Sequence, residues 1–264
     1  MNGPAFLHVS SIDMDVDDYL RARGVVFRTF GGYDSGCTGY GVEAAGRRWF
    51  VKHAWHKRAA AGLKRAAEIH TQVRHPALAP LRNRFEAPDG LVLVYDWAHG
   101  DWLRDQVAIE RFRLLAVPEA TAAVDTIFDL HAALAAQGFI AVDLYDGSFI
   151  YDFDARRMYV CDLDEYRTAP FILDMERLPG STRFMAPEEW SRGSMIDQAT
   201  NVFTLGRTAA ILLGNHAGRA KHFRAGEAMW SIVERATQQS RARRFASVKE
   251  FVEAWRAAGM EKTQ

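Results

Sequence analysis

The chain has 264 residues, enough for one large domain or two smaller lobes with a sizeable core. Lysine and arginine total 33, and aspartate and glutamate also total 33, so no net field favours nucleic acid or an anionic membrane. The longest apolar runs, such as residues 208–213, are far shorter than the roughly 20 residues that span a bilayer, and the first residues lack a signal core. We therefore expect a soluble, cytoplasmic protein that binds neither nucleic acid nor membrane.

The cysteines and histidines give no sign of a metal centre. Cys37 and Cys161 lie far apart without a C-x-x-C pattern, and the nine histidines show no ligand spacing. Neither a disulfide framework nor a zinc site is indicated. The composition leaves the oligomeric state open.

Strand patterns dominate the first third of the chain. Residues 1–24 are acidic, and we expect a short helix before Gly24. We assign them no role in binding or catalysis. Alternating or apolar runs predict strands at residues 25–27, 40–45, 48–52, 78–85 and 91–95. Between the third and fourth of these strands, an alanine-rich run predicts a helix at residues 57–74.

A glycine-rich turn and a lysine stand out among these strands. Residues 34–39, D-S-G-C-T-G, match G-x-G-x-x-G with Asp34 in place of the first glycine. Gly36 and Gly39 would let backbone N–H groups approach phosphate oxygens. A plain hairpin is the alternative, and Asp34 would repel phosphate if it pointed inward. Lys52 ends the third strand, where Phe50 shares its face because strand side chains alternate.

The second half of the chain carries two acids in a strand, turn and strand pattern. A helix at residues 118–137, whose apolar stripe belongs to the core, ends at Gly138. Asp143 then opens a polar turn, and Asp162 follows a hairpin. Such an arrangement can direct one carboxylate at a nucleophile and the other at a metal-bound phosphate.

This segment resembles the catalytic loop and metal-binding motif of protein kinases, H-R-D-L-x-x-x-x-N followed by D-F-G. Asp143 stands at the catalytic aspartate and Asp162 at the magnesium-binding aspartate. The departures from the pattern are Ala141-Val142 for His-Arg, Ser148 for Asn, and Leu163-Asp164 for Phe-Gly. Asp164 is either a substitute metal ligand or a solvated loop acid.

Three later segments strengthen the resemblance, which extends over residues 25–257. Residues 180–188, G-S-T-R-F-M-A-P-E, are similar to the G-T-x-x-Y-M-A-P-E end of the kinase activation segment. Residues 200–206 are similar to S-D-V-F-S-L-G, with Asn201 for Asp, whose amide oxygen can still accept backbone N–H bonds. Residues 244–251 resemble the R-F-x-S-x-x-E-F helix of bacterial eukaryotic-like Ser/Thr protein kinases, whose arginine, here Arg244, would pair with Glu188.

The resemblance implies an α+β, bilobal, protein-kinase-like fold, with a small β-rich N-lobe containing one long helix and a larger helical C-lobe. We expect an extension at residues 1–24, lobes at residues 25–96 and 97–258, and a tail at residues 259–264. The implied ligands are ATP and Mg²⁺, and the implied partner is a protein substrate. The resemblance implies roles in binding or catalysis for Gly36, Gly39, Lys52, Glu68, Asp96, Ala98, Asp143, Ser148 and Asp162.

Each of these residues has its own implied task. Lys52 would position phosphates and Asp143 the substrate hydroxyl, while Asp162 and Ser148 would hold the metal. The carbonyl of Asp96 and the N–H of Ala98 would meet adenine, beside Tyr95 as gatekeeper and Trp97 as packing. Glu68 is the only acid in the helix at residues 57–74 and the candidate partner of Lys52. However, counting back from His75-Pro76 places the usual glutamate nearer Ala66.

Three hypotheses about function stay open. The first is an active protein kinase acting on Ser or Thr. The second is a pseudokinase that binds partners without transfer, favoured by Phe50, Tyr145, Ser148, Asp164 and Asn201. The third is a small-molecule phosphotransferase, which normally lacks the A-P-E segment. Because Val142 replaces the arginine that holds a loop phosphate, we expect any activity to be independent of phosphorylation at Thr168 or Thr182, and we expect Ser181 to contact Asp143.

Overall fold

The structure is a computed structural model that describes residues 3–31 and 36–260. The chain forms two compact units. The N-terminal unit comprises Met1–Ala98 and the short segment Asp162–Asp164, and the C-terminal unit comprises His99–Cys161 and Glu165–Gln264. The fold is α+β, with a five-stranded sheet in the first unit and mainly helices in the second. None of the helices in the described part of the chain combines the length and apolar character needed to cross a membrane.

The sheet of the N-terminal unit is antiparallel, with the strand order β1-β2-β3-β5-β4. Its strands are β1 (Val25–Phe30), β2 (Cys37–Ala44), β3 (Arg47–Ala54), β4 (Leu81–Ala87) and β5 (Gly90–Asp96). All five predicted strands are confirmed, although β4 begins after the predicted residue 78. Alternation along β3 places Trp49 and Val51 on one face of the sheet and Phe50 and Lys52 on the other.

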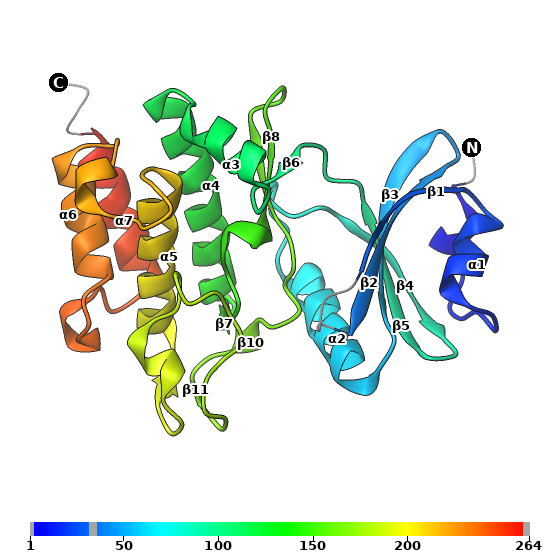
Figure 1. Cartoon of the computed structure of the whole chain (residues 1–264). Coiled ribbons are helices and arrows are strands. Elements are labelled where there is room, and N and C mark those ends of the chain that lie inside the picture. Colours follow the sequence, from blue (N-terminus) through cyan, green and yellow to red (C-terminus); the bar gives the residue numbers. More distant parts are fainter. Residues whose placement is uncertain (1–2, 32–35, 261–264) are drawn as a thin grey trace. The chain divides into compact units, whose positions relative to one another are not determined.

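Both faces of this sheet are covered within the unit (Figure 1). The residues predicted as an extension form η1 (Ala5–Leu7) and α1 (Val16–Arg21), and their apolar side chains pack on the Trp49 face of the sheet. The helix α2 (Lys57–Gln72) lies on the opposite face, where small residues such as Ala66 are buried. Residues 3–24 therefore pack as a layer of the N-terminal unit.

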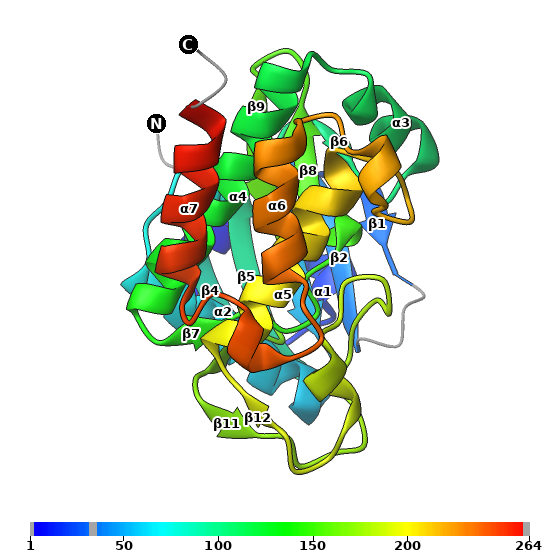
Figure 2. The same ribbon diagram turned by 90° about the vertical axis from the view of Figure 1, so that its left-hand side faces the viewer.

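The C-terminal unit is built around α4 (Val117–Ala136) and α5 (Gln198–Leu212). Figure 2 shows α6 (Glu227–Ala236) and α7 (Val248–Met260) side by side, next to α4 and α5. Phe128 of α4 anchors this packing, because its ring centre lies 4.9 Å from Phe251 and 5.1 Å from Trp255. The predicted helix at residues 118–137 is confirmed, and Gly138, which follows the C-cap residue Gln137, has a φ of 79°.

Short strands fix the loops of this unit. The predicted hairpin is confirmed as β8 (Phe149–Asp152) and β9 (Arg157–Val160), joined by β6 (Asp101–Trp102). The remaining pairs are β7 (Phe139–Ile140) with β10 (Arg167–Thr168), and β11 (Phe171–Ile172) with β12 (Met195–Ile196). The remaining helices of the described chain are α3 (Gln106–Arg113), η2 (Asp146–Ser148), η3 (Pro187–Trp190), η4 (Ala220–His222) and η5 (Arg241–Arg243).

Candidate functional site

Lys52 is the centre of an ion-pair cluster in the N-terminal unit. Its Nζ lies 2.7 Å from Oδ1 of Asp162 and 2.5 Å from Oδ2 of Asp164. The side chain of Lys52 is only 16% exposed. Burial acts to lower the pKa of Lys52, but the two carboxylates outweigh it and hold the pKa well above its usual value. The structure therefore brings Lys52 and Asp162, two of the predicted site residues, into direct contact.

Asp162 and Asp143 share an unusual backbone conformation. Their φ angles are 65° and 61°, in the left-handed region that costs a residue with a Cβ about 1–2 kcal/mol. The other non-glycine residues with positive φ in the described chain are Ala45 and Arg156, both in hairpin turns. Strain of this kind concentrates at functional sites. Asp143 and Asp162, which the sequence pattern indicates as functional acids, are thus also the non-glycine residues of the described chain that have a left-handed backbone outside a hairpin turn.

Asp164 is held from several sides. Nη2 of Arg65, on α2, donates a hydrogen bond of 2.7 Å to the backbone carbonyl of Asp164. A Cβ at Gly62 would lie 3.3 Å from the Cβ of Asp164, so the glycine gives Asp164 room against the helix. Sγ of Cys37 is 4.0 Å from Oδ2 of the same residue. The side chain of Asp164 is 15% exposed, so it is a buried partner of Lys52 and not a solvated loop acid.

Glu68 does not meet Lys52 in the structure. It is exposed on α2, where its carboxylate accepts a hydrogen bond of 3.1 Å from Nε2 of Gln72. Ala66, near the position expected for the glutamate, is buried. The helical period turns Glu68 away from the buried face, so the predicted Lys52–Glu68 pair is wrong for this structure.

The two predicted phosphate-binding glycines have different environments. Gly36, with a φ of 70°, directly precedes β2. Gly39 is not in the turn as predicted but inside β2, opposite Phe30 and Lys52 of the neighbouring strands. A Cβ on Gly39 would lie 2.9 Å from the ring of Phe50, so the glycine makes room for that ring. Asp34, the other position of interest in this turn, lies outside the described residues.

An aromatic cluster covers the Lys52 face of the sheet beside these glycines. It consists of Phe27, Phe30, Phe50, Tyr95 and Trp97. The ring centre of Phe50 lies 5.9 Å from Phe30 and 6.2 Å from Tyr95, while Trp97 lies 5.1 Å from Phe27. Burial raises the pKa of Tyr95 far above its usual value. The packing role predicted for Trp97 is confirmed.

The predicted adenine-binding residues lie at the end of this unit. Asp96 is the last residue of β5, and its carboxylate accepts hydrogen bonds of 3.0 Å and 2.5 Å from Arg82. Ala98 is the last residue of the N-terminal segment of the unit. The role predicted for them concerns the carbonyl of Asp96 and the N–H of Ala98, and it stays a prediction.

Asp143 lies on a pocket of the C-terminal unit with a volume of about 590 Å³. Residues from four parts of the C-terminal unit line the pocket: the segment from β6 to α3, the turn at Asp143, the segment that begins at Gly180, and one histidine. They are Leu103, Arg104, Gln106, Ile109, Arg113, Asp143, Tyr145, Asp146, Gly180, Ser181, Arg183 and His216. Arg183 and Asp146 form an ion pair of 2.5 Å. Asp143 and Ser181 line the same pocket, as expected, but a bond between them stays a prediction.

Ser148 closes the turn that presents Asp143. Its hydroxyl lies 3.4 Å from the carbonyl oxygen of Asp143 and accepts a bond of 3.3 Å from the N–H of Tyr145. Ser148 is only 1% exposed, whereas the side chain of Asp162 is 46% exposed. Magnesium takes oxygen ligands and keeps several waters. Asp162 therefore presents an accessible carboxylate and Ser148 a buried hydroxyl, and the metal-ligand roles of both stay predictions.

Asn201 braces the start of this turn from α5. Its Oδ1 accepts a bond of 2.7 Å from the N–H of Ala141, and its Nδ2 donates one of 2.8 Å to the carbonyl of the same residue. Asn201 is buried, so neither bond competes with water. The prediction that the amide replaces the expected carboxylate as an acceptor is confirmed.

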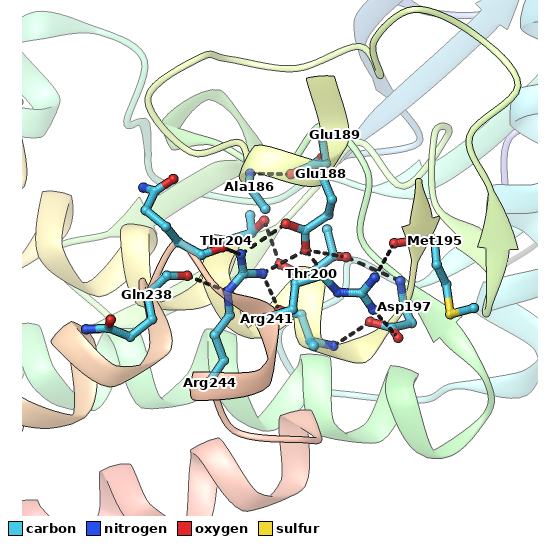
Figure 3. A network of polar contacts seen from close by, with 12 residues as sticks. Ala186, Glu188, Glu189, Met195, Asp197, Thr200, Thr204, Gln238, Arg241 and Arg244 are labelled. Carbon is cyan, nitrogen blue, oxygen red and sulfur yellow. Dashed lines mark hydrogen bonds and ion pairs between the residues drawn. The ribbon is translucent and has the colours of Figure 1, made fainter. Parts of the chain in front are cut away.

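Glu188 and Arg244 form the predicted ion pair (Figure 3). The two guanidinium nitrogens of Arg244 lie 2.7 Å and 3.0 Å from the carboxylate oxygens of Glu188, and the Arg244 side chain is fully buried. Thr200 donates a further bond of 2.9 Å to the same carboxylate. Burial acts to raise the pKa of Glu188, but these donors hold it below its usual value. The neighbouring Glu189 is also buried, which raises its pKa to about 8.

Several site residues were not predicted from the sequence. Arg65, Gly62 and Cys37 surround Asp164, and Arg104 and Arg113 line the Asp143 pocket. Only the glycine inside an otherwise helical run was a visible signal. Comparisons with models of known protein families and with characterised proteins gave no match.

Proposed function

We propose that this protein is a divergent protein kinase, which transfers the γ-phosphate of ATP to a Ser or Thr hydroxyl of a protein. The observation that carries the proposal is the contact between Lys52 and Asp162, two residues far apart in sequence that the kinase pattern assigns to the same phosphate group. A kinase-like fold is further supported by the antiparallel sheet with one long helix, and by the buried pair of Glu188 and Arg244.

In this proposal the N-terminal unit holds the nucleotide. The ammonium group of Lys52 binds phosphate oxygens, and the exposed carboxylate of Asp162 would hold Mg²⁺. The bound ion supplies positive charge to the phosphate oxygens. The backbone near Gly36 and the hinge residues Asp96 and Ala98 are the candidates for the remaining nucleotide contacts.

The C-terminal unit prepares the acceptor. The pocket at Asp143 is large enough for a side chain with its flanking peptide, since ligand pockets typically measure about 300–1,000 Å³. Asp143 accepts a hydrogen bond from the acceptor hydroxyl and takes its proton. The hydroxyl oxygen forms the new bond to phosphorus as the bond to ADP breaks.

A second candidate function, a pseudokinase that binds partners without transfer, is favoured by the aromatic cluster. Phe50 stands where the kinase pattern has a small residue over adenine, and its ring packs against Gly39, Phe30 and Tyr95. Ser148 is turned into the protein and offers a metal no accessible oxygen. Both features weaken nucleotide binding or metal binding without removing the charged residues.

The proposal is tested by nucleotide binding and autophosphorylation in the presence and absence of Mg²⁺. We expect calorimetry to show ATP binding that Mg²⁺ strengthens. We expect Asp162→Asn to raise the magnesium requirement at least tenfold and to abolish autophosphorylation. Asp154→Asn, which removes an exposed turn acid, serves as the matched control. Wild-type activity in Asp162→Asn would reject the assignment.

A further inference from the structure

Lys52 has two carboxylate partners that differ in how they are held. Asp162 is nearly half exposed and carries the strained backbone. Asp164 is largely buried, and its oxygen lies closer to the ammonium nitrogen, at 2.5 Å against 2.7 Å. The two acids are therefore an outer and an inner partner of the same lysine.

The inner partner is fixed by the elements around it. The guanidinium of Arg65 holds the backbone of Asp164 through its carbonyl, and Gly62 allows the residue to lie against α2. Cys37 of β2 borders its carboxylate. These contacts hold Asp164 without any help from Asp162.

The helix α2 supplies no carboxylate to Lys52. Glu68, the only acid between Lys57 and Gln72, faces outward and is bonded to Gln72 within the helix. The buried face of α2 carries small and apolar residues instead. Asp164 is thus the ion-pair partner of Lys52 in the role that the resemblance to kinases predicted for Glu68.

We propose that Asp164 is the positioning residue of Lys52, so that Asp162 is free to leave the ammonium group for a metal ion. The inference rests on the proposed function and names a role for a residue that it does not use. If Asp162 turned to a metal and Lys52 had no second partner, its largely buried charge would be uncompensated until phosphate oxygens reached it, which is strongly unfavourable. Asp164 prevents this and keeps the ammonium aimed at the phosphates.

A metal-ligand role for Asp164 is the competing explanation. It requires the carboxylate to leave Lys52 and to reach an ion from a largely buried position. A positioning residue affects nucleotide binding only when Lys52 is present. A metal ligand affects nucleotide binding whether or not Lys52 is present. The two roles therefore differ in a double-mutant cycle.

The experiment measures binding of ATP with Mg²⁺ by calorimetry in the wild-type and Lys52→Met backgrounds. We expect Asp164→Asn to weaken binding at least tenfold in the wild-type background and less than twofold beside Lys52→Met. The magnesium concentration for half-maximal binding should stay unchanged. Equal losses in both backgrounds, or a raised magnesium requirement, would overturn the inference.

Two further variants complete the design. Glu43→Gln removes an exposed acid from β2 and should leave binding unchanged. Asp164→Glu keeps the carboxylate and should retain affinity within threefold, so it carries the test if Asp164→Asn does not fold. A tenfold loss in folded Asp164→Glu would also overturn the inference. If the wild-type protein binds no ATP, the proposed function itself falls, whatever residue 164 does.

Discussion

Phe50 is the single residue that most directly limits the use of the N-terminal unit as a nucleotide site. It projects on the same face of β3 as Lys52, and its ring sits on Gly39 between Phe30 and Tyr95. The ring is held by contacts from three strands, so it does not swing away without disturbing them. A nucleotide base would have to pack against this ring or displace it.

We expect Phe50→Ala to tighten ATP binding about tenfold, equivalent to about 1.4 kcal/mol, because the smaller side chain opens the sheet face next to Lys52. Calorimetric titration with ATP is the measurement. Phe27→Ala, which removes a ring that contacts Trp97, is the control from the same cluster. Unchanged affinity in Phe50→Ala would mean that the ring leaves the base-binding surface open.

His70 gives the N-terminal unit a pH dependence of its own. It is packed 5.2 Å from the ring of Tyr95, and burial lowers its pKa from 6.5 to about 4. Between these values the unfolded chain binds more protons than the folded one. The contribution of neutral, buried His70 to the free energy of unfolding is therefore fully present above pH 6.5 and is lost as the pH falls toward 4.

At about 1.36 kcal/mol per pH unit, this loss amounts to about 2 kcal/mol at pH 5. The His70→Gln variant should lose much less stability than the wild type between pH 7.5 and pH 5, because it has no group to protonate there. Urea unfolding at the two pH values measures the difference. An equal pH dependence in both proteins would show that other groups cause it.

At the scale of elements, the segment after Asp164 is held to the rest of the C-terminal unit by apolar packing and by an ion pair. Val142 is buried in a cluster with Leu173 and Leu178 of that segment. Arg183, one of the arginines near enough in sequence to hold a loop phosphate, is paired with Asp146. The apolar cluster and this ion pair both anchor the segment within the C-terminal unit.

We expect Thr168→Ala and Thr182→Ala to keep most of the wild-type transfer rate after phosphatase treatment. Val142 offers no donor to a phosphate on either threonine. Initial rates of phosphate transfer by treated and untreated proteins are the measurement. A tenfold loss, about 1.4 kcal/mol in the barrier, would show that the segment is gated by phosphate.

The pair between Glu188 and Arg244 joins η3 to the segment before α7. Arg244 also donates bonds to the carbonyls of Gln238 and Ala199, at 2.7 Å and 3.0 Å. It donates a third bond, of 3.2 Å, to the carbonyl of Gln239. Removing the guanidinium would leave a buried carboxylate and three carbonyls without these donors. Breaking a buried pair in this way costs about 3–5 kcal/mol.

Arg244→Ala should therefore lower the free energy of unfolding by about 3–5 kcal/mol in urea. Arg256→Ala is the matched control, because Arg256 also binds two acids, Asp125 and Asp129, but is 44% exposed. Its loss should cost less than about 1 kcal/mol. Equal effects of the two variants would contradict the buried network as a source of stability.

These elements show what could be predicted from the sequence. The strands of the sheet follow from alternation, and the Glu188–Arg244 pair was implied by the resemblance of residues 180–188 and 244–251 to kinase motifs. The position of Gly39 was wrong because strand and turn share the same glycine-rich run. The predicted partner of Lys52, Glu68, was wrong because the observed contact with Asp164 joins segments that are distant in sequence. No local periodicity of the sequence indicates such a contact.

At the scale of the whole molecule, the first 24 residues belong to the N-terminal unit. Phe6, Tyr19 and Leu20 are buried with Trp49 and Phe85 on the face of the sheet opposite α2. The amide of Asn83 donates bonds of 2.9 Å to the carbonyls of Phe6 and Val9. Apart from a short helix before Gly24, this layer could not be predicted from the sequence, because its few apolar residues are spread over an acidic segment without a clear period.

The two units carry different parts of the proposed reaction. The N-terminal unit holds Lys52 with Asp162 and Asp164, and the C-terminal unit holds Asp143 in its pocket. Binding of ATP alone tests only the first part. Transfer needs both, and it separates a kinase from a binding module.

The most direct test is the incorporation of label from γ-labelled ATP into the protein or a Ser/Thr peptide, in the wild type and in Asp143→Asn. We expect incorporation by the wild type. In Asp143→Asn we expect incorporation to be at least about a hundredfold lower, the usual contribution of a general base, with ATP affinity within twofold of wild type. Wild-type protein that binds ATP without transferring label, or Asp143→Asn that transfers label at the wild-type rate, would contradict the proposed kinase activity.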